Sequence, residues 1–123
     1  MFENTKAYSG FAVDDVQKAR DFYEGKLELK TSEEHGMLTL HIAGDRATLV
    51  YPKPDHSPAD YTILNFPVDD IDKAVDELLA RGVRFERYDG FEQDEKGVMR
   101  DNGPTIAWFT DPAGNILAVI EQD

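Results

Sequence analysis

An internal repeat constrains the fold of this chain more than any other feature of its sequence. Residues 11–21 read FAVDDVQKARD, and residues 66–76, 55 positions later, read FPVDDIDKAVD, with seven identities in register. Self-similarity at a fixed spacing is the signature of a structural unit that occurs more than once in a chain. We therefore predict two copies of one folding unit.

Each copy begins as a strand and turns into a helix at a pair of aspartates. The strand-like runs are Ala7–Val13 and Tyr61–Val68, and the pairs that follow them are Asp14-Asp15 and Asp69-Asp70. A carboxylate at a helix N-terminus accepts hydrogen bonds from free backbone N–H groups and interacts favourably with the helix dipole. Helix capping is favoured over a catalytic or calcium-binding role, because one physical cause then explains both pairs.

Both predicted helices are amphipathic and should pack on a sheet. The apolar stripes consist of Val16, Ala19, Phe22 and Tyr23 in the first copy and Ile71, Ala74, Val75, Leu78 and Leu79 in the second. Gly82 follows the second stripe and predicts a C-terminal cap.

Three more strands follow each predicted helix. Alternating apolar runs joined by short turns predict two hairpins, Met37–Ile42 with Arg46–Tyr51 and Thr105–Thr110 with Ile116–Glu121, and further strands are predicted at Leu29–Glu33 and Val83–Tyr88. The fold class is therefore α+β, with two β-α-β-β-β modules at about residues 5–54 and 60–123 of a single domain, 1–123. The charged stretch Asp89–Pro104 is expected to be a loop or lid.

Composition excludes several classes of protein. A chain of 123 residues with 41% hydrophobic residues is enough for one domain. No apolar run approaches the roughly 18 residues of a membrane span, and the first residues show no export signal, so we expect no membrane partner and a cytoplasmic location. The lack of cysteine excludes disulfides and thiolate sites. A net charge of −12 would repel phosphate backbones, so nucleic acid is not an expected partner.

Three motifs resemble those of the vicinal oxygen chelate superfamily. They are Val13-Asp-Asp-Val followed by Phe22-Tyr23, the second Val68-Asp-Asp-Ile, and the turn Asp111-Pro-Ala-Gly-Asn115. This superfamily includes glyoxalase I, extradiol dioxygenases, methylmalonyl-CoA epimerase and bleomycin-resistance proteins. The resemblance implies glyoxalase-like paired modules whose sheets curl into a partly open barrel around a cavity, commonly in a homodimer.

The resemblance also locates the positions where metal-dependent members of the superfamily carry their ligands. In this chain these positions fall at Tyr8, Leu49, Ile63 and Ala118. A catalytic zinc or iron site needs about three nitrogen or carboxylate donors. We therefore expect neither the superfamily's usual metal nor another cofactor. The three histidines match no metal motif, although His41 lies on a predicted strand that could line the cavity.

If the ligand positions mark the inner faces of the sheets, strand alternation indicates which residues line the cavity. Alternation and the ligand positions give Tyr8, Gly10, Leu49, Ile63, Asn65 and Ala118 as predicted ligand-binding residues. Tyr51 and Trp108 are added to this set because their rings could supply stacking surface. The residues of the set are mostly apolar or aromatic, with a few polar groups, which is typical of a pocket for a small organic molecule.

Three functions are compatible with the sequence. The first is a metal-free protein that binds a small hydrophobic or aromatic molecule without turnover, as resistance proteins of the superfamily do. The second is a lyase, isomerase or dioxygenase with relocated metal ligands, or an acid–base catalyst that uses Tyr8, Glu92 or Asp94. The third is a scaffold whose cavity is filled by its own side chains.

Overall fold

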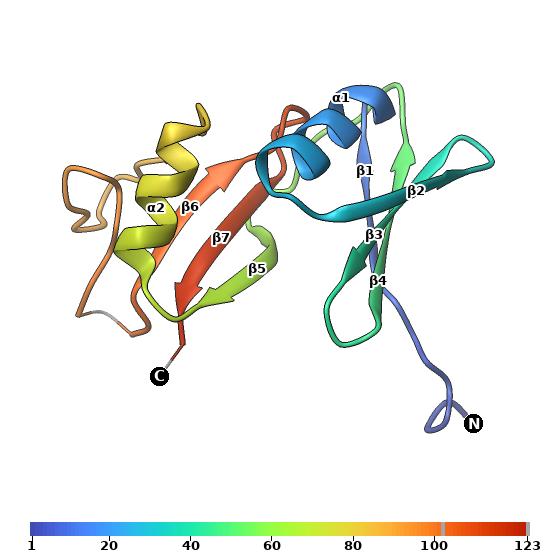
Figure 1. Ribbon diagram of the computed structural model, residues 1–123, viewed down its shortest axis with the longest axis horizontal. Coiled ribbons are helices and arrows are strands. Elements are labelled where there is room, and N and C mark those ends of the chain that lie inside the picture. The colour runs from blue at the N-terminus through green and yellow to red at the C-terminus, as the bar shows by residue number, and fades with distance from the viewer. Residues whose placement is uncertain (102, 123) are drawn as a thin grey trace. The chain divides into compact units, whose positions relative to one another are not determined.

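A computed structural model describes residues 1–101 and 103–122, which form two compact units, Met1–His56 and Ser57–Asp123. Each unit has its own sheet and its own helical segment (Figure 1). That the two modules make up a single domain stays a prediction.

The first unit is a four-stranded sheet with a helical segment between its first two strands. Its elements are β1 (Gly10–Val13), α1 (Val16–Arg20), the π-helix η1 (Asp21–Lys26), β2 (Lys30–Glu34), β3 (Met37–Ile42) and β4 (Arg46–Pro52). The strand order is β1-β4-β3-β2, in which β1 runs parallel to β4 and the other neighbours are antiparallel. The predicted strand at Leu29–Glu33 and the first predicted hairpin are therefore confirmed.

The core of the first unit lies between one face of this sheet and its helical segment. Phe11, Val50 and Leu38 occupy one row across β1, β4 and β3 and are all buried. Phe22 and Tyr23 in η1 are buried as well, and their ring centroids lie 5.2 Å apart in an edge-to-face contact. The stripe predicted from the sequence thus does pack inward, although α1 has only five residues before it widens into η1.

The second unit repeats the topology of the first, without a counterpart of β2. Its elements are β5 (Thr62–Val68), α2 (Ile71–Ala80), β6 (Ile106–Thr110) and β7 (Ile116–Glu121). The strand order is β5-β7-β6, with β5 parallel to β7 and β6 antiparallel to β7. Ile71 and Val75 of α2 are fully buried, whereas Leu79, predicted to lie on the same apolar stripe, is 41% exposed because it sits in the last turn of the helix.

The helix ends follow the caps predicted from the sequence. The carboxylates of Asp15 and Asp70, the second residue of each pair, accept hydrogen bonds of 3.1 Å from the backbone N–H groups of Lys18 and Lys73. At the end of α2, Gly82 has a φ of +85°, and the N–H groups of Gly82 and Val83 donate to carbonyls in the last turn. This pattern is a Schellman motif, which requires a left-handed residue after the helix.

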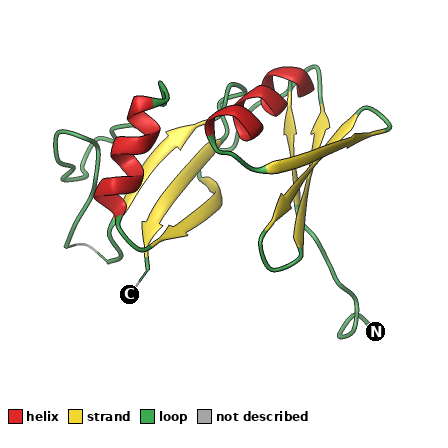
Figure 2. Ribbon diagram, viewed as in Figure 1, coloured by secondary structure: helices red, strands yellow, loops and turns green. Residues whose placement is uncertain are grey.

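The strand predicted at Val83–Tyr88 is wrong. The described part of the segment between α2 and β6 is loop (Figure 2). Only isolated bridges form there, including one between Phe85 and Phe109. The reason is that the Gln93 side chain accepts from the N–H of Tyr88 and donates to the carbonyl of Glu86. Glu86 still donates its N–H to the Trp108 carbonyl at 2.8 Å. The Glu86 carbonyl and the Tyr88 N–H, however, are taken up by the Gln93 side chain, and Ile106 of β6 pairs with Met99 instead.

None of the helices in residues 1–101 and 103–122 has the length and apolar character needed to cross a bilayer.

Candidate functional site

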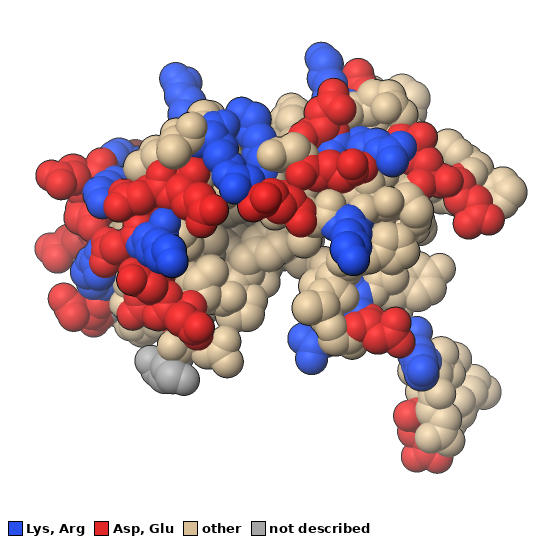
Figure 3. Space-filling model, in the orientation of Figure 1, with Lys and Arg blue, Asp and Glu red and all other residues tan. Residues whose placement is uncertain are grey.

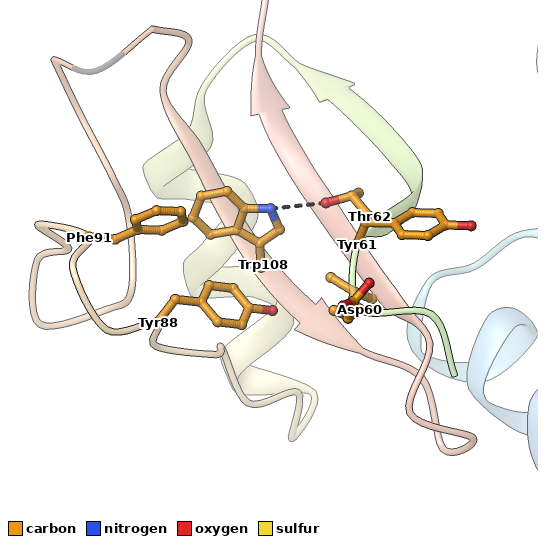
Figure 4. Close-up of a pocket in the computed structure, with 7 residues that line it drawn as sticks. Asp60, Tyr61, Thr62, Tyr88, Phe91 and Trp108 are labelled. Carbon is orange, nitrogen blue, oxygen red and sulfur yellow. Dashed lines mark hydrogen bonds between the residues drawn. The ribbon is translucent and has the colours of Figure 1, made fainter. Parts of the chain in front are cut away.

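An open pocket of about 390 Å³ lies within the second unit (Figure 4). It is lined by Asp60, Tyr61, Thr62, Tyr88, Phe91, Trp108 and Ile116. The lining residues come from β5 and the segment just before it, from β6 and β7, and from the loop that follows α2. All of them belong to one compact unit, so the pocket is defined within that unit.

The sheet register explains why Trp108 faces this pocket. Trp108 pairs with Ala118 of β7, and Ala118 pairs with Asn65 of β5, so these three residues form one row across the sheet. The next row toward the pocket joins Thr62 with Ile116. Ile116 is two residues before Ala118, so both side chains lie on the same face of β7. Residues of the alternate rows, such as Phe109, lie on the opposite face and are buried there.

A bulge at Ile63 shifts the face on which the first residues of β5 lie. The register of β5 with β7 is irregular between Thr62 and Leu64, so Ile63 has no partner across the pair. An extra residue in one strand reverses the alternation of side chains beyond it. Thr62 therefore lines the pocket, whereas Ile63, which strict alternation predicted to share a face with Asn65, does not line it.

Three aromatic rings form a contiguous wall of the pocket. The ring centroids of Tyr88 and Trp108 and those of Phe91 and Trp108 are both 5.4 Å apart, and those of Tyr88 and Phe91 are 5.9 Å apart. Such separations are typical of attractive aromatic contacts. The indole N–H of Trp108 donates a 3.1 Å hydrogen bond to the Thr62 hydroxyl, which fixes the orientation of the indole (Figure 4).

The Tyr88 hydroxyl differs from the other polar groups at the pocket. Its oxygen is buried and has no hydrogen-bond partner. Burial raises the pKa of this phenol above its ordinary value, and the nearby Glu86 carboxylate raises it further. The hydroxyl therefore stays protonated near neutral pH and can act as a hydrogen-bond donor.

The Gln93 side chain holds the Tyr88–Phe91 segment in place. Its carbonyl oxygen accepts from the N–H of Tyr88 at 2.9 Å, and its amide nitrogen donates to the carbonyls of Glu86 and Gly97 at 2.9 and 2.7 Å. Three hydrogen bonds of one part-buried amide thus join Glu86 and Tyr88, at the start of the loop, to Gly97 farther along it. The aromatic wall is thus supported by a hydrogen-bonded loop.

Ion pairs connect the rest of this loop to α2. Lys96 contacts Asp76 at 2.6 Å and Arg100 contacts Asp72 at 2.7 Å, with both aspartates on the exposed side of the helix. Figure 3 shows acidic and basic side chains interspersed over this part of the surface. The predicted loop at Asp89–Pro104 is thus attached to α2 at Lys96 and Arg100, and its function as a lid stays a prediction.

The four predicted site residues of the second unit occupy different environments. Trp108 lines the pocket and is only 9% exposed. Ala118 is fully buried beneath the same sheet face, while Asn65 is exposed beside it. Ile63 occupies the bulge.

The other four predicted site residues belong to the first unit. Tyr8 precedes β1 and is 68% exposed, and Tyr51 is 40% exposed on β4. Gly10 pairs with Leu49, and a Cβ on Gly10 would lie 3.0 Å from the Leu49 carbonyl oxygen. The small size of Gly10 therefore serves the close approach of β1 to β4. His41 of β3 lies 2.8 Å from the Ser32 hydroxyl and is exposed.

Sequence reasoning missed Tyr88 and Phe91 as pocket residues. Tyr88 was assigned to a strand, and Phe91 lies in a stretch whose charges indicated a solvated loop. The available signal was the presence of two large aromatic residues next to that charged stretch, since a loop exposed on all sides has no reason to carry them. Asp60 and Thr62 gave no comparable signal.

The residues at the positions that the sequence resemblance assigns to metal ligands do not fit a metal ion. The side chains of Leu49, Ile63 and Ala118 contain no donor atom, and Tyr8 is an exposed phenol. Within either unit, the described residues contain no group of three or more His, Asp or Glu side chains that could hold a metal. The donor chemistry at these positions is thus that of an apolar site.

Comparison with known proteins gives one family and many structures of the same fold. The model of the Glyoxalase/Bleomycin resistance protein/Dioxygenase superfamily matches residues 7–119. No curated protein matched the sequence. A superfamily member from Sphaerobacter thermophilus DSM 20745 is 25% identical, with a TM-score of 0.71 over 96% of this chain and 98% of that one.

Two further structures share the fold at lower identity. TnmS3, an antibiotic binding protein from Streptomyces sp. CB03234, is 22% identical with a TM-score of 0.69, and 98% of each chain is covered. The fosfomycin resistance protein FosX from Listeria monocytogenes is 12% identical with a TM-score of 0.72, over 95% of this chain and 92% of that one. The repeated topology, the three sequence motifs and the family match lead to one conclusion. The chain belongs to the Glyoxalase/Bleomycin resistance protein/Dioxygenase superfamily.

Proposed function

We propose that this protein binds a small apolar or aromatic molecule in the pocket of its second unit and releases it unchanged. The observation that carries this proposal is the wall formed by Tyr88, Phe91 and Trp108 around a space of about 390 Å³. Pockets for small organic ligands have volumes of this order and combine aromatic walls with a few polar groups. Aromatic side chains supply both apolar area and a preferred stacking geometry.

Binding without turnover is favoured over catalysis by the chemistry of the lining. Asp60 is the only carboxylate among the lining residues, and it is exposed. General acid–base catalysis needs a group positioned against the reacting atoms and usually a partner that tunes it. The two relatives described as an antibiotic binding protein and a fosfomycin resistance protein support a role in sequestration or resistance. The homodimer and the cytoplasmic location expected from the sequence remain parts of this proposal.

Trp108 is the only tryptophan in the chain, so its fluorescence reports directly on the pocket. We expect the neutral dye N-phenyl-1-naphthylamine to bind saturably at one molecule per chain, with Trp108 emission falling as energy is transferred to the dye. Phe91→Ala should weaken binding by about tenfold, because the loss of a stacked ring costs roughly 1–1.5 kcal/mol. Mass spectrometry should recover the dye unchanged.

Leu79→Ala is the matched control, because Leu79 is an exposed apolar residue of the same unit that does not line this pocket. It should leave the affinity for the dye unchanged. Non-saturable binding, or equal affinities for the Phe91→Ala variant and the wild type, would contradict the proposed function.

A further inference from the structure

We propose that the ligand of this pocket is a neutral aromatic molecule with a carbonyl group, and that this carbonyl accepts a hydrogen bond from the Tyr88 hydroxyl. This inference rests on the proposed function and adds to it the chemical class of the ligand. It starts from a polar atom that the folded protein leaves without a partner.

The Tyr88 hydroxyl is the only buried hydroxyl without a hydrogen-bond partner among residues 1–101 and 103–122. Buried polar groups in folded proteins are nearly always paired, because an unpaired one costs about 1–3 kcal/mol. The Tyr88 ring lines the pocket, and its hydroxyl points toward the Asp60 side of it (Figure 4). Because this oxygen has essentially no accessible surface in the free protein, a ligand atom reaches it only when neighbouring side chains shift to admit the ligand. A ligand atom that enters in this way is the natural partner for this group.

The electrostatic surroundings decide which kind of atom this partner is. Burial and the Glu86 carboxylate keep the pKa of Tyr88 above its ordinary value, so the phenol is a donor and its partner must accept. Asp60 lines the same pocket, and the chain carries a net charge of −12, so a carboxylate or phosphate on the ligand would be repelled. A neutral carbonyl satisfies both conditions. When conjugated to an aromatic ring it is also coplanar with that ring and can stay within the stacking plane.

The free protein has already lost the hydration of this hydroxyl. A hydrogen bond in binding usually gains little, because both partners give up water to form it. Here only the ligand carbonyl has to be dehydrated, so the bond contributes more to affinity than an exposed hydroxyl would. Tyr61 provides the contrast, because it lines the same pocket but is 67% exposed.

Two probes of the same shape isolate this hydrogen bond. They are 2-acetylnaphthalene, which has a C=O group, and 2-isopropenylnaphthalene, which has a C=CH₂ group in the same place. Each is titrated against bound N-phenyl-1-naphthylamine in the wild type, in Tyr88→Phe and in the matched control Tyr61→Phe. The quantity measured is the ratio of the two affinities in each protein. Comparing this ratio between the wild type and a variant cancels the intrinsic difference in polarity between the probes.

We expect Tyr88→Phe to reduce the preference for the ketone by about tenfold and Tyr61→Phe to leave it unchanged. Since Tyr88→Phe removes an unpaired buried group, its melting temperature should equal or exceed that of the wild type. The carbonyl stretch of 2-acetylnaphthalene bound to the wild type should also shift to lower frequency, a measurement that needs no variant.

The outcomes separate this inference from the proposed function. If both probes displace the dye but the affinity ratio is the same in the wild type and Tyr88→Phe, the carbonyl contact is overturned and the proposed function stands. An unshifted carbonyl stretch has the same meaning. If neither the dye nor the probes bind, the proposed function fails and this inference fails with it.

Discussion

Asp94 shows how a single side chain organises the loop that carries Tyr88 and Phe91, two of the three rings of the aromatic wall. One of its carboxylate oxygens accepts from the backbone N–H groups of Lys96 and Val98, both at 2.9 Å, and the other is 3.3 Å from Arg100. Its partial burial would raise the pKa of Asp94, but the two amide hydrogen bonds and Arg100 outweigh this effect, so the pKa lies below its ordinary value of 3.8. Lys96 and Arg100 in turn bind aspartates of α2.

This lowered pKa predicts how stability depends on pH. The unfolded chain takes up a proton at Asp94 at a higher pH than the folded chain, so the contribution of Asp94 is complete above about pH 5 and is lost as the pH falls through the folded value. The loss of unfolding free energy between about pH 5 and about pH 3 should therefore be smaller in Asp94→Asn than in the wild type. Urea unfolding at several pH values measures this difference.

Glu95→Gln serves as the control, since it removes one exposed carboxyl from the neighbouring position. Its unfolding free energy should fall with pH as steeply as that of the wild type. If the unfolding free energy falls equally with pH in the wild type and in Asp94→Asn, the hydrogen bonds of Asp94 do not favour its charged form.

At the scale of single residues, the sequence predicted the site only in part. Trp108 could be proposed as a pocket residue because its large ring offers stacking surface, and it does line the pocket. Thr62 could not, because the bulge at Ile63 depends on the pairing of β5 with β7 and has no signal of its own in the sequence. Tyr88 and Phe91 lie in a loop whose conformation is held by Gln93, which bonds to Glu86, Tyr88 and Gly97, and this loop conformation is not predictable from the sequence pattern.

At the scale of secondary-structure elements, local signals were sufficient for both helix starts, both hairpins and the end of α2. Each depends on a few neighbouring residues, such as the Asp15 and Asp70 caps and the turn at Asp111–Asn115. The segment Val83–Tyr88 was mispredicted because its apolar residues suit a strand, while its backbone partners are decided by Gln93. Such a competition cannot be read from propensity alone.

The end of α2 provides a test at this scale with two identical substitutions. Gly82→Ala should lower the unfolding free energy by about 1 kcal/mol, because Gly82 has a φ of +85°, which an alanine side chain disfavours. Gly25→Ala in η1 should leave stability unchanged or raise it by up to about 1 kcal/mol, because a Cβ there would meet no atom within 4 Å. Chemical denaturation of both variants measures the difference.

Gly25→Ala is itself the control, since it introduces the same methyl group at a helical position. Equal destabilisation by the two substitutions would mean that the left-handed conformation of Gly82 is not what costs energy. In that case the cause would be a loss of helix shared by both variants, which far-UV circular dichroism would detect.

At the scale of the whole molecule, the repeat in the sequence corresponds to a repeat in topology. In both units a first strand, a helical segment and a final hairpin are connected in the same way. This correspondence was predictable, because it follows from the duplicated sequence. The pocket belongs to the second unit, in which the loop after α2 stands where the first unit has β2.

The metal content of the whole protein tests the interpretation of the superfamily's ligand positions. Protein purified without chelator should contain well below one equivalent of zinc, nickel, manganese or iron per chain, because Leu49, Ile63 and Ala118 supply no donor atoms. Elemental analysis together with native mass spectrometry measures this. One bound equivalent would instead show that other side chains hold a metal and would favour a lyase or dioxygenase.

The pairing of first with last strands has a consequence for synthesis. A ribosome produces the chain from its N-terminus, and a strand cannot pair before its neighbour has been made. The first unit has all its strands once Pro52 has been added, whereas β5 must wait for Ile116–Glu121. The aromatic wall therefore gains its supporting sheet only once Glu121 has been added, well after the first unit has been able to fold.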